Sequence, residues 1–174
     1  MQRRMAIGAM LAWVAAGATA QLGPAVRRPD GLLVFEDDPS IIDFASWLPN
    51  PVRLRSAEIL VLDGRHQFIR VVSTDGVEGV VKANSRMEEV TSLFHQVAAP
   101  PFINRDLREL QDILGGLFRA QYKFAGLAFW TAVGHLELAI WDLLGKTAKK
   151  RCVDMMGGAV RETIPIYVSS LDRN

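Results

Sequence analysis

Chemically versatile side chains are concentrated in one apolar stretch, Thr131–Gly158. It contains His135, Glu137, Asp142 and Cys152. A histidine, carboxylates and a thiol are the groups that serve as bases, metal ligands and nucleophiles. Each role needs partner groups at a defined spacing, and the sequence contains no phosphate-binding loop, zinc-ligand spacing or serine triad. These residues therefore assign no catalytic site and no metal site.

The spacing of these residues favours structural roles. His135 has no carboxylate close in sequence to orient it, so we expect its nitrogens to be satisfied within the fold rather than to act as a base. Glu137 and Asp142 lie five residues apart and point in different directions on a helix, which excludes a metal-binding pair. We expect interdomain hydrogen bonds from these carboxylates, or an ion pair with Lys146. The single cysteine, Cys152, excludes an internal disulfide.

Composition and charge limit the class of protein. The chain has 174 residues, 49% hydrophobic and 22% charged, which is the composition of one globular domain. Its formal net charge is +1. A near-neutral chain without a basic patch gives no electrostatic basis for binding nucleic acid.

The first twenty residues have the pattern of a signal peptide. Arg3-Arg4 precedes an apolar run from Met5 to Gly17, and Ala18-Thr19-Ala20 is a small-x-small cleavage site. The paired arginines are compatible with the twin-arginine route. We therefore expect residues 1–20 to be a signal peptide and the protein to be exported, periplasmic or extracellular. An uncleaved signal would leave it membrane-anchored, and a misplaced start codon is the remaining interpretation.

A change of hydrophobic period marks the start of the domain. Residues 21–51 are punctuated by prolines and are expected to form a lead-in arm on the domain surface, with a short helix starting at Asp38-Pro39. Short β-branched runs separated by turn residues follow. They predict three antiparallel strands, Val52–Leu62, Gln67–Ser73 and Val77–Lys82.

Helical periodicity follows the strands. Ser85–Glu88 has the pattern of a capping box, which predicts a helix running to Val97. Asn104 is the expected N-cap residue of a second helix, in which Gly115-Gly116 suggests a kink or a close helix crossing. A third helix, about Ala125–Lys146, is apolar nearly all round, so we expect it to be buried on several sides and to need a further packing partner. Thr163–Val168 then predicts one more strand.

The third helix also carries a family resemblance. Glu137–Lys146 (ELAIWDLLGK), Met155–Gly158 (MMGG) and Ile164–Tyr167 (IPIY) together resemble the N-terminal region of the mandelate racemase/muconate lactonizing enzyme family, within the enolase superfamily. The likeness covers about Val52–Asn174. Two features depart from the family pattern. His135 stands where the family usually has a small residue, and Arg151-Cys152 replaces the usual Pro-aliphatic pair.

The resemblance implies an α+β fold: a three-stranded antiparallel meander followed by a helical bundle, with the first strand of a truncated (β/α)₈ barrel at the C-terminus. Residues 52–160 would be the capping domain, and residues 161–174 would begin the barrel. In the family, the barrel abstracts the proton α to a carboxylate, and Mg²⁺ stabilises the enediolate. Its catalytic lysines or histidine and its metal ligands would lie beyond Asn174, so we carry none of them onto this chain.

The family's capping domain selects substrates through two loops. By resemblance these are Asp63–His66, with Arg65 and His66, and Ala83–Arg86, with Asn84, Ser85 and Arg86. An arginine here could hold an acid substrate's carboxylate with two hydrogen bonds. The structural interpretation of the same residues is a solvated turn and a helix N-terminus.

Two functions remain open from the sequence. The first is the capping, substrate-selecting portion of a Mg²⁺-dependent acid-sugar dehydratase, racemase or cycloisomerase, inactive as a 174-residue chain. Its partners would be a small carboxylate or sugar-acid substrate, the missing barrel and further copies in a homo-oligomer. The second is a non-catalytic binding or assembly module that self-associates or pairs with a separate barrel.

Overall fold

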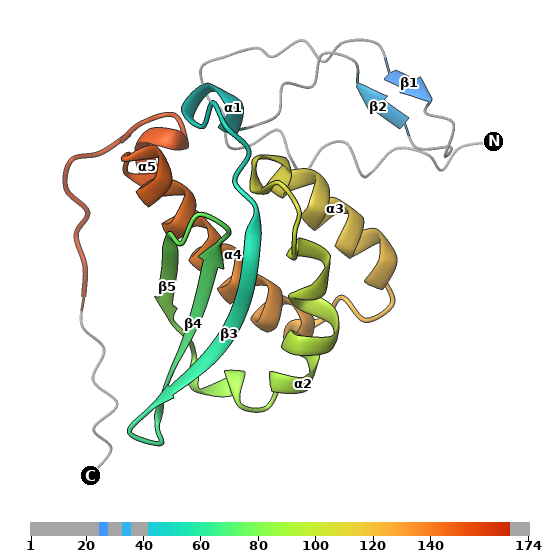
Figure 1. The fold of residues 1–174 in the computed structure, drawn as a ribbon, viewed down its shortest axis with the longest axis vertical. Coiled ribbons are helices and arrows are strands. Elements are labelled where there is room, and N and C mark those ends of the chain that lie inside the picture. The colour runs from blue at the N-terminus through green and yellow to red at the C-terminus, as the bar shows by residue number, and fades with distance from the viewer. Residues whose placement is uncertain (1–24, 28–32, 36–41, 168–174) are drawn as a thin grey trace. The chain divides into compact units, whose positions relative to one another are not determined.

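The computed structural model describes residues 25–27, 33–35 and 42–167 and divides the chain into two units, Met1–Ile41 and Ile42–Asn174. In the first unit, β1 (Ala25–Arg27) pairs antiparallel with β2 (Leu33–Phe35). The expected signal peptide and the helix start at Asp38-Pro39 lie outside the described residues. The second unit contains every other described element (Figure 1).

A three-stranded antiparallel sheet opens the second unit. Its strands are β3 (Leu54–Leu62), β4 (His66–Ser73) and β5 (Glu78–Lys82), in the order β3-β4-β5. The turn between β3 and β4 places Asp63 and Gly64 at positive φ, 51° and 66°, which glycine and aspartate tolerate better than most residues. The predicted meander is confirmed, with each boundary within two residues of its expected position.

The helical part is more broken than the sequence predicted. The expected helix up to Val97 is instead a 3₁₀ turn (Ser85–Met87), α2 (Thr91–Leu93) and a π-helical turn (Phe94–Ala98). The longer helices are α3 (Leu110–Gln121) and α4 (Leu127–Ala148), and α5 (Cys152–Met155) follows. A sheet followed by packed helices confirms the α+β fold class.

Helix α4 crosses the sheet at Gly79. A Cβ atom on Gly79 would lie 2.0 Å from the Ala139 carbonyl oxygen and 2.7 Å from the Leu143 amide nitrogen. Only glycine allows the backbones of β5 and α4 to approach this closely. The close crossing lies here, whereas α3 runs uninterrupted through Gly115-Gly116. Helix α4 is long and apolar enough to cross a membrane, and half of its most apolar window is buried inside the domain.

Polar side chains of α4 also bond to the outer edge of β5. The Val80 amide donates to Oδ2 of Asp142 at 2.8 Å, and Nζ of Lys146 donates to the Glu78 carbonyl at 3.0 Å. Asp142 and Lys146 form an ion pair at 2.7 Å, which confirms the predicted pairing. Backbone groups of an edge strand otherwise offer a template for pairing with another chain, so α4 protects this edge.

The segment expected to be part of the lead-in arm contributes to the core. Helix α1 (Phe44–Trp47) begins after Asp43, whose Oδ1 accepts hydrogen bonds from two amides of its first turn. Phe44 and Leu48 are buried, and the Phe44 ring lies 5.0 Å from the Trp141 ring in a tilted arrangement. Residues from Ile42 onward therefore belong to the same compact unit as the sheet.

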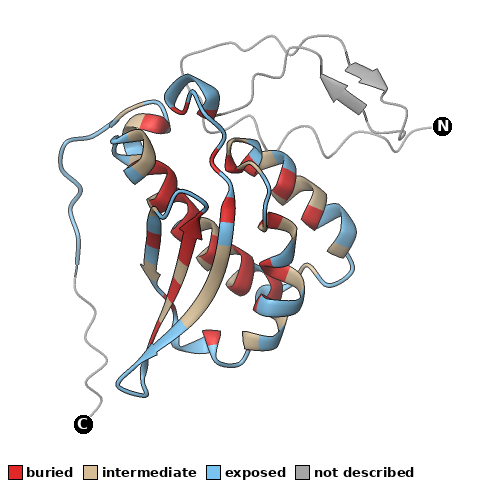
Figure 2. Cartoon of the chain, in the orientation of Figure 1, coloured by how far each residue is buried: buried red, intermediate tan, exposed pale blue. Residues whose placement is uncertain are grey.

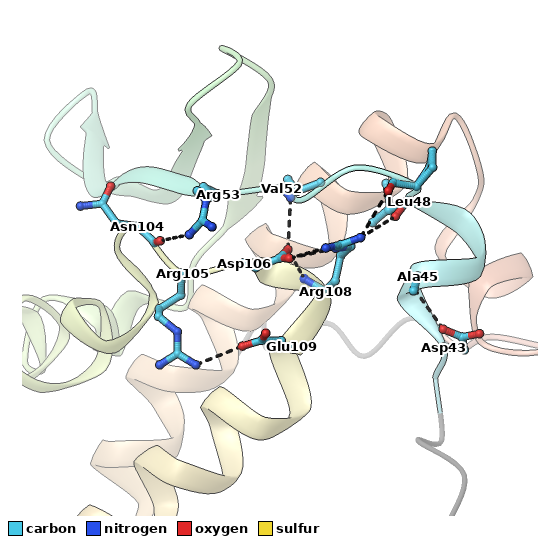
Figure 3. Close-up of polar contacts among 11 residues, drawn as sticks. Asp43, Ala45, Leu48, Val52, Arg53, Asn104, Arg105, Asp106, Arg108 and Glu109 are labelled. Carbon is cyan, nitrogen blue, oxygen red and sulfur yellow. Dashed lines mark hydrogen bonds and ion pairs between the residues drawn. The ribbon is translucent and has the colours of Figure 1, made fainter.

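Asp106 and Arg108 connect the segment between α1 and β3 to the turn that precedes α3 (Figure 3). Its carboxylate accepts from the Val52 amide at 3.2 Å and pairs with the Arg108 guanidinium at 2.8 Å. Arg108 in turn donates to the Leu48 carbonyl. Burial alone would raise the pKa of Asp106, but the hydrogen bonds from Arg108 and Val52 outweigh burial and hold it below its usual value. Asp106, rather than the expected Asn104, is the N-cap residue of the turn before α3.

The C-terminal segment does not form the predicted strand within the described residues. Arg161–Tyr167 has no regular secondary structure, and the side chains of Ile164, Ile166 and Tyr167 are exposed. Val168, the last residue of the predicted strand, lies outside the described residues. A strand needs a neighbouring backbone for its hydrogen bonds, and this segment pairs with none of the described strands.

Candidate functional site

Both predicted substrate loops lie at the same end of the sheet. The first loop, Asp63–His66, leads into β4, and the second, Ala83–Arg86, follows the end of β5. Because β4 and β5 are antiparallel, these two ends are adjacent, and the Ala83 amide donates to the Gln67 carbonyl at 2.8 Å. Figure 1 shows both at the lower end of the sheet. The antiparallel register therefore brings together residues that are about twenty positions apart in sequence.

The first loop presents free polar side chains. Arg65 and His66 are exposed, and neither side chain forms a hydrogen bond or ion pair within the described part of the chain. The turn itself is closed by the Arg65 amide, which donates to the Leu62 carbonyl at 3.2 Å. Figure 2 shows the tip of this hairpin as exposed surface. A cation and an imidazole at this tip are available to a ligand.

The second loop is ordered by Asn84 rather than by the expected capping box. Oδ1 of Asn84 accepts from the Arg86 amide at 2.9 Å and from the Ser85 hydroxyl at 3.4 Å. The prediction that Ser85 is the N-cap residue is therefore wrong: the asparagine one position earlier bonds to the first free amide. The Arg86 guanidinium lies 3.8 Å from the Glu89 carboxylate, and both side chains are about two-thirds exposed. An exposed pair of this kind leaves Arg86 free to exchange partners.

His135 connects this loop to α4. Nε2 of His135 lies 3.1 Å from the Asn84 amide nitrogen, and Nδ1 lies 2.7 Å from the Thr131 carbonyl oxygen. Both ring nitrogens are thus satisfied by the backbone, which confirms the expected structural histidine. No local pattern indicated that its partner would be the predicted substrate loop. A lone histidine on a largely apolar helix was the available signal.

Gln67 is a further polar residue that sequence reasoning missed. Its side chain is 8% exposed, and its Oε1 has no hydrogen-bond partner among the described residues. It lies directly after His66 and bonds through its carbonyl to Ala83, so it is placed between the two loops. A buried acceptor without a donor costs about 1–3 kcal/mol. The alternation of β4 indicates that residue 67 faces the helices, but not that its amide is unpaired.

A shallow groove of about 590 Å³ lies along α4 and α5, with His135 in its lining. It is lined by apolar and polar groups together: Trp130, Gly134, His135, Glu137, Leu138, Trp141, Asp142, Cys152 and Met156. Trp130, Leu138 and Met156 are about half exposed. The Cys152 thiol points to the Trp141 carbonyl at 3.5 Å, and the Trp141 indole to Glu137 at 3.4 Å. We expect the further packing partner of this helix to contact these exposed apolar groups.

The described residues do not fit a magnesium site. Within residues 42–167, no three His, Cys, Asp or Glu side chains lie close enough together to hold a metal ion. Magnesium needs several oxygen ligands in octahedral geometry. The described residues by themselves therefore support no metal-dependent reaction step.

A protein-family comparison confirms the family resemblance that the sequence predicted. The model of the mandelate racemase/muconate lactonizing enzyme N-terminal domain matches residues 50–157. The chain belongs to this family. The match covers the sheet, both predicted substrate loops and helices α2 to α5.

Curated relatives agree with this assignment. A D-mannonate dehydratase from Caulobacter vibrioides is 28% identical over 120 residues, which are 67% of this chain and 30% of the relative. A D-galactonate dehydratase family member from Marinomonas is 31% identical, with the same coverage. The chain thus spans about 30% of the length of the curated relatives that it matches, and this part is their N-terminal domain.

Solved structures share the fold. A mandelate racemase/muconate lactonizing protein from Paracoccus denitrificans, complexed with magnesium, aligns with a TM-score of 0.54 at 20% identity and covers 63% of this chain and 31% of its own. A muconate cycloisomerase from Azorhizobium caulinodans aligns with a TM-score of 0.55 at 19% identity, covering 67% and 34%. These likenesses support the capping-domain fold without assigning a substrate.

Proposed function

We propose that residues 42–160 are the capping, substrate-selecting part of a Mg²⁺-dependent acid-sugar dehydratase, racemase or cycloisomerase of the enolase superfamily. The observation that carries the proposal is the meeting of the two polar loops at one end of the sheet. Arg65 has no partner there among the described residues, and Arg86 forms an exposed, weak pair with Glu89. Two guanidinium groups at one edge suit recognition of a carboxylate.

The names of the relatives favour a dehydratase of sugar acids over the other two activities. They include D-mannonate dehydratases and members of the D-galactonate dehydratase family. In this proposal the barrel of the full-length enzyme holds Mg²⁺ and removes the α-proton, and the two loops of the capping domain contact the distal part of the substrate. The 174-residue chain by itself would then have no turnover.

A chimeric enzyme tests the proposal. Residues 42–160 replace the corresponding N-terminal domain of the Caulobacter vibrioides D-mannonate dehydratase, and turnover is measured with Mg²⁺ and a panel of sugar acids. We expect Mg²⁺-dependent dehydration of at least one sugar acid. A folded chimera that is inactive on the whole panel would count against the proposal. Dehydration or α-proton exchange by the 174-residue chain alone would show that the chemistry has been misplaced.

A second candidate function is a non-catalytic assembly module, favoured by the exposed apolar groups. Trp130, Leu138 and Met156 surround the groove, and Phe124 and Leu127 are more than three-quarters exposed. Exposed apolar surface of this kind usually contacts a partner. A defined dimer in light scattering that Leu138→Arg converts to monomer would support this module. Concentration-independent monomers would argue against self-association.

We also propose that the protein is exported through residues 1–20. The supporting feature is the sequence pattern of a charged start, an apolar run and a small-x-small site. The intact mass of the secreted protein should correspond to a chain that begins at Gln21. Protein in the membrane fraction whose mass includes residues 1–20 would indicate an uncleaved membrane anchor instead.

A further inference from the structure

The imidazole of His135 contacts the second substrate loop at its first polar residue. The Asn84 amide nitrogen and Nε2 are 3.1 Å apart, and the ring is oriented from its other side by the Thr131 carbonyl at 2.7 Å from Nδ1. Thr131 lies one helical turn before His135, so this second contact is made within α4. The ring therefore forms a bridge from the helix backbone to the loop backbone.

The two partners define the tautomer of the ring. A carbonyl oxygen only accepts, so the proton must be on Nδ1; a backbone amide only donates, so Nε2 must be the acceptor. The neutral imidazole with its proton on Nδ1 satisfies both contacts. The cationic ring would leave the Asn84 amide without its acceptor, and the tautomer with its proton on Nε2 would leave both backbone groups without a partner.

This contact sets the conformation of the loop that follows. Once the Asn84 backbone is held against α4, its side chain accepts from the Arg86 amide at 2.9 Å and from the Ser85 hydroxyl at 3.4 Å. These contacts form the 3₁₀ turn that carries Ser85 and Arg86. A small side chain at position 135 would not reach the loop.

We propose that His135 is a positioning residue that fixes the Ala83–Arg86 loop and thereby the presentation of Ser85 and Arg86 to an acid substrate. The substrate part rests on the proposed function. The positioning part rests on the two hydrogen bonds of the ring. The role of His135 is to hold, through Asn84, a loop that selects the substrate.

Nuclear magnetic resonance of the ¹⁵N-labelled 174-residue chain tests this inference. We expect imidazole ¹⁵N shifts of a ring protonated on Nδ1, and a through-hydrogen-bond coupling between the Asn84 amide nitrogen and Nε2 of His135. In His135→Ala, amide hydrogen exchange at Asn84 should become about five- to tenfold faster, the effect of losing one hydrogen bond. His135→Gln should restore much of the protection, because its Oε1 accepts from the same amide.

The control is His95→Ala, which removes an exposed histidine that does not contact the loop. It should leave exchange at Asn84 unchanged. A ring protonated on Nε2, or Asn84 exchange that is the same in His135→Ala and wild type, would overturn the inference. If His135→Ala does not fold, the ring shifts and the coupling in the wild-type chain decide alone. These measurements report loop order and not turnover, so they stand or fall independently of the proposed function.

Discussion

Replacing Gly79 by alanine tests the closest contact of the fold. The added Cβ would lie 2.0 Å from the Ala139 carbonyl oxygen, whereas real contacts of this kind are not shorter than 3.0 Å. Strand β5 and helix α4 must therefore separate by about 1 Å, because the two nearest atoms, the Ala139 carbonyl oxygen and the Leu143 amide nitrogen, belong to the backbone and cannot rotate away.

This separation lowers the free energy of unfolding in two ways. Overpacking in a well-packed core costs about 1–3 kcal/mol. The same movement stretches two hydrogen bonds between α4 and the edge of β5, each contributing about 1 kcal/mol. We expect Gly79→Ala to lower the free energy of unfolding by roughly 3–5 kcal/mol, a large part of the ~5–15 kcal/mol available to a typical domain.

Urea unfolding followed by tryptophan fluorescence measures this loss, because Trp141 is buried in the core. The matched control is Gly134→Ala in the middle of α4, where an added Cβ meets no atom within 4 Å. Alanine should stabilise that helix by about 0.5–1 kcal/mol. If Gly79→Ala changes stability by less than about 1 kcal/mol, the packing of β5 on α4 described above is wrong.

Three further substitutions test other contacts, each by urea unfolding. Asp106→Asn should lower the free energy of unfolding by about 1–3 kcal/mol at pH 7. Because the folded-state pKa of Asp106 is lowered, this difference is fully present above the unfolded pKa of about 4 and should shrink as the pH falls from there through the lower folded-state pKa. A difference that stays constant as the pH falls below about 4 would contradict the pairing with Arg108. Asp142→Ala should cost about 1–2 kcal/mol by releasing the edge of β5, whereas the exposed Asp112→Ala should cost nothing measurable, and equal losses would contradict the edge contact. Phe44→Ala should cost about 3–5 kcal/mol, and a neutral effect would show that α1 is not part of the core.

The strands were predictable because their signals are local. Period-two alternation and the turn residues at Asp63-Gly64 and Gly76 fix both the register and the direction of each strand. The apolar circumference of α4 was predictable for the same reason, and so was the Asp142–Lys146 pair, which follows from helical spacing. The antiparallel order then brings the two loops together without further information.

The start of the second loop was not predictable from the sequence. Ser85 and Asn84 are both good N-cap residues, and the residue that caps the turn, Asn84, also contacts His135, which lies 51 positions later. In the same way, Asp106 prevails over Asn104 because its carboxylate also accepts from the amide of Val52, two residues before β3. Local sequence patterns identify the candidate N-cap residues, and tertiary contacts determine which of them caps the helical turn.

The central claim, that the two loops select the substrate, is tested most directly in the chimera with the Caulobacter vibrioides barrel. The measurement is the ratio of kcat/KM between the two best sugar acids, in the parent chimera and in its Arg65→Ala, Arg86→Ala and Lys149→Ala variants. We expect at least one loop variant to change this ratio by about tenfold, the effect of roughly 1.4 kcal/mol of differential transition-state binding, and Lys149→Ala to leave it unchanged. Ratios that stay within about twofold of the parent in both loop variants would contradict it.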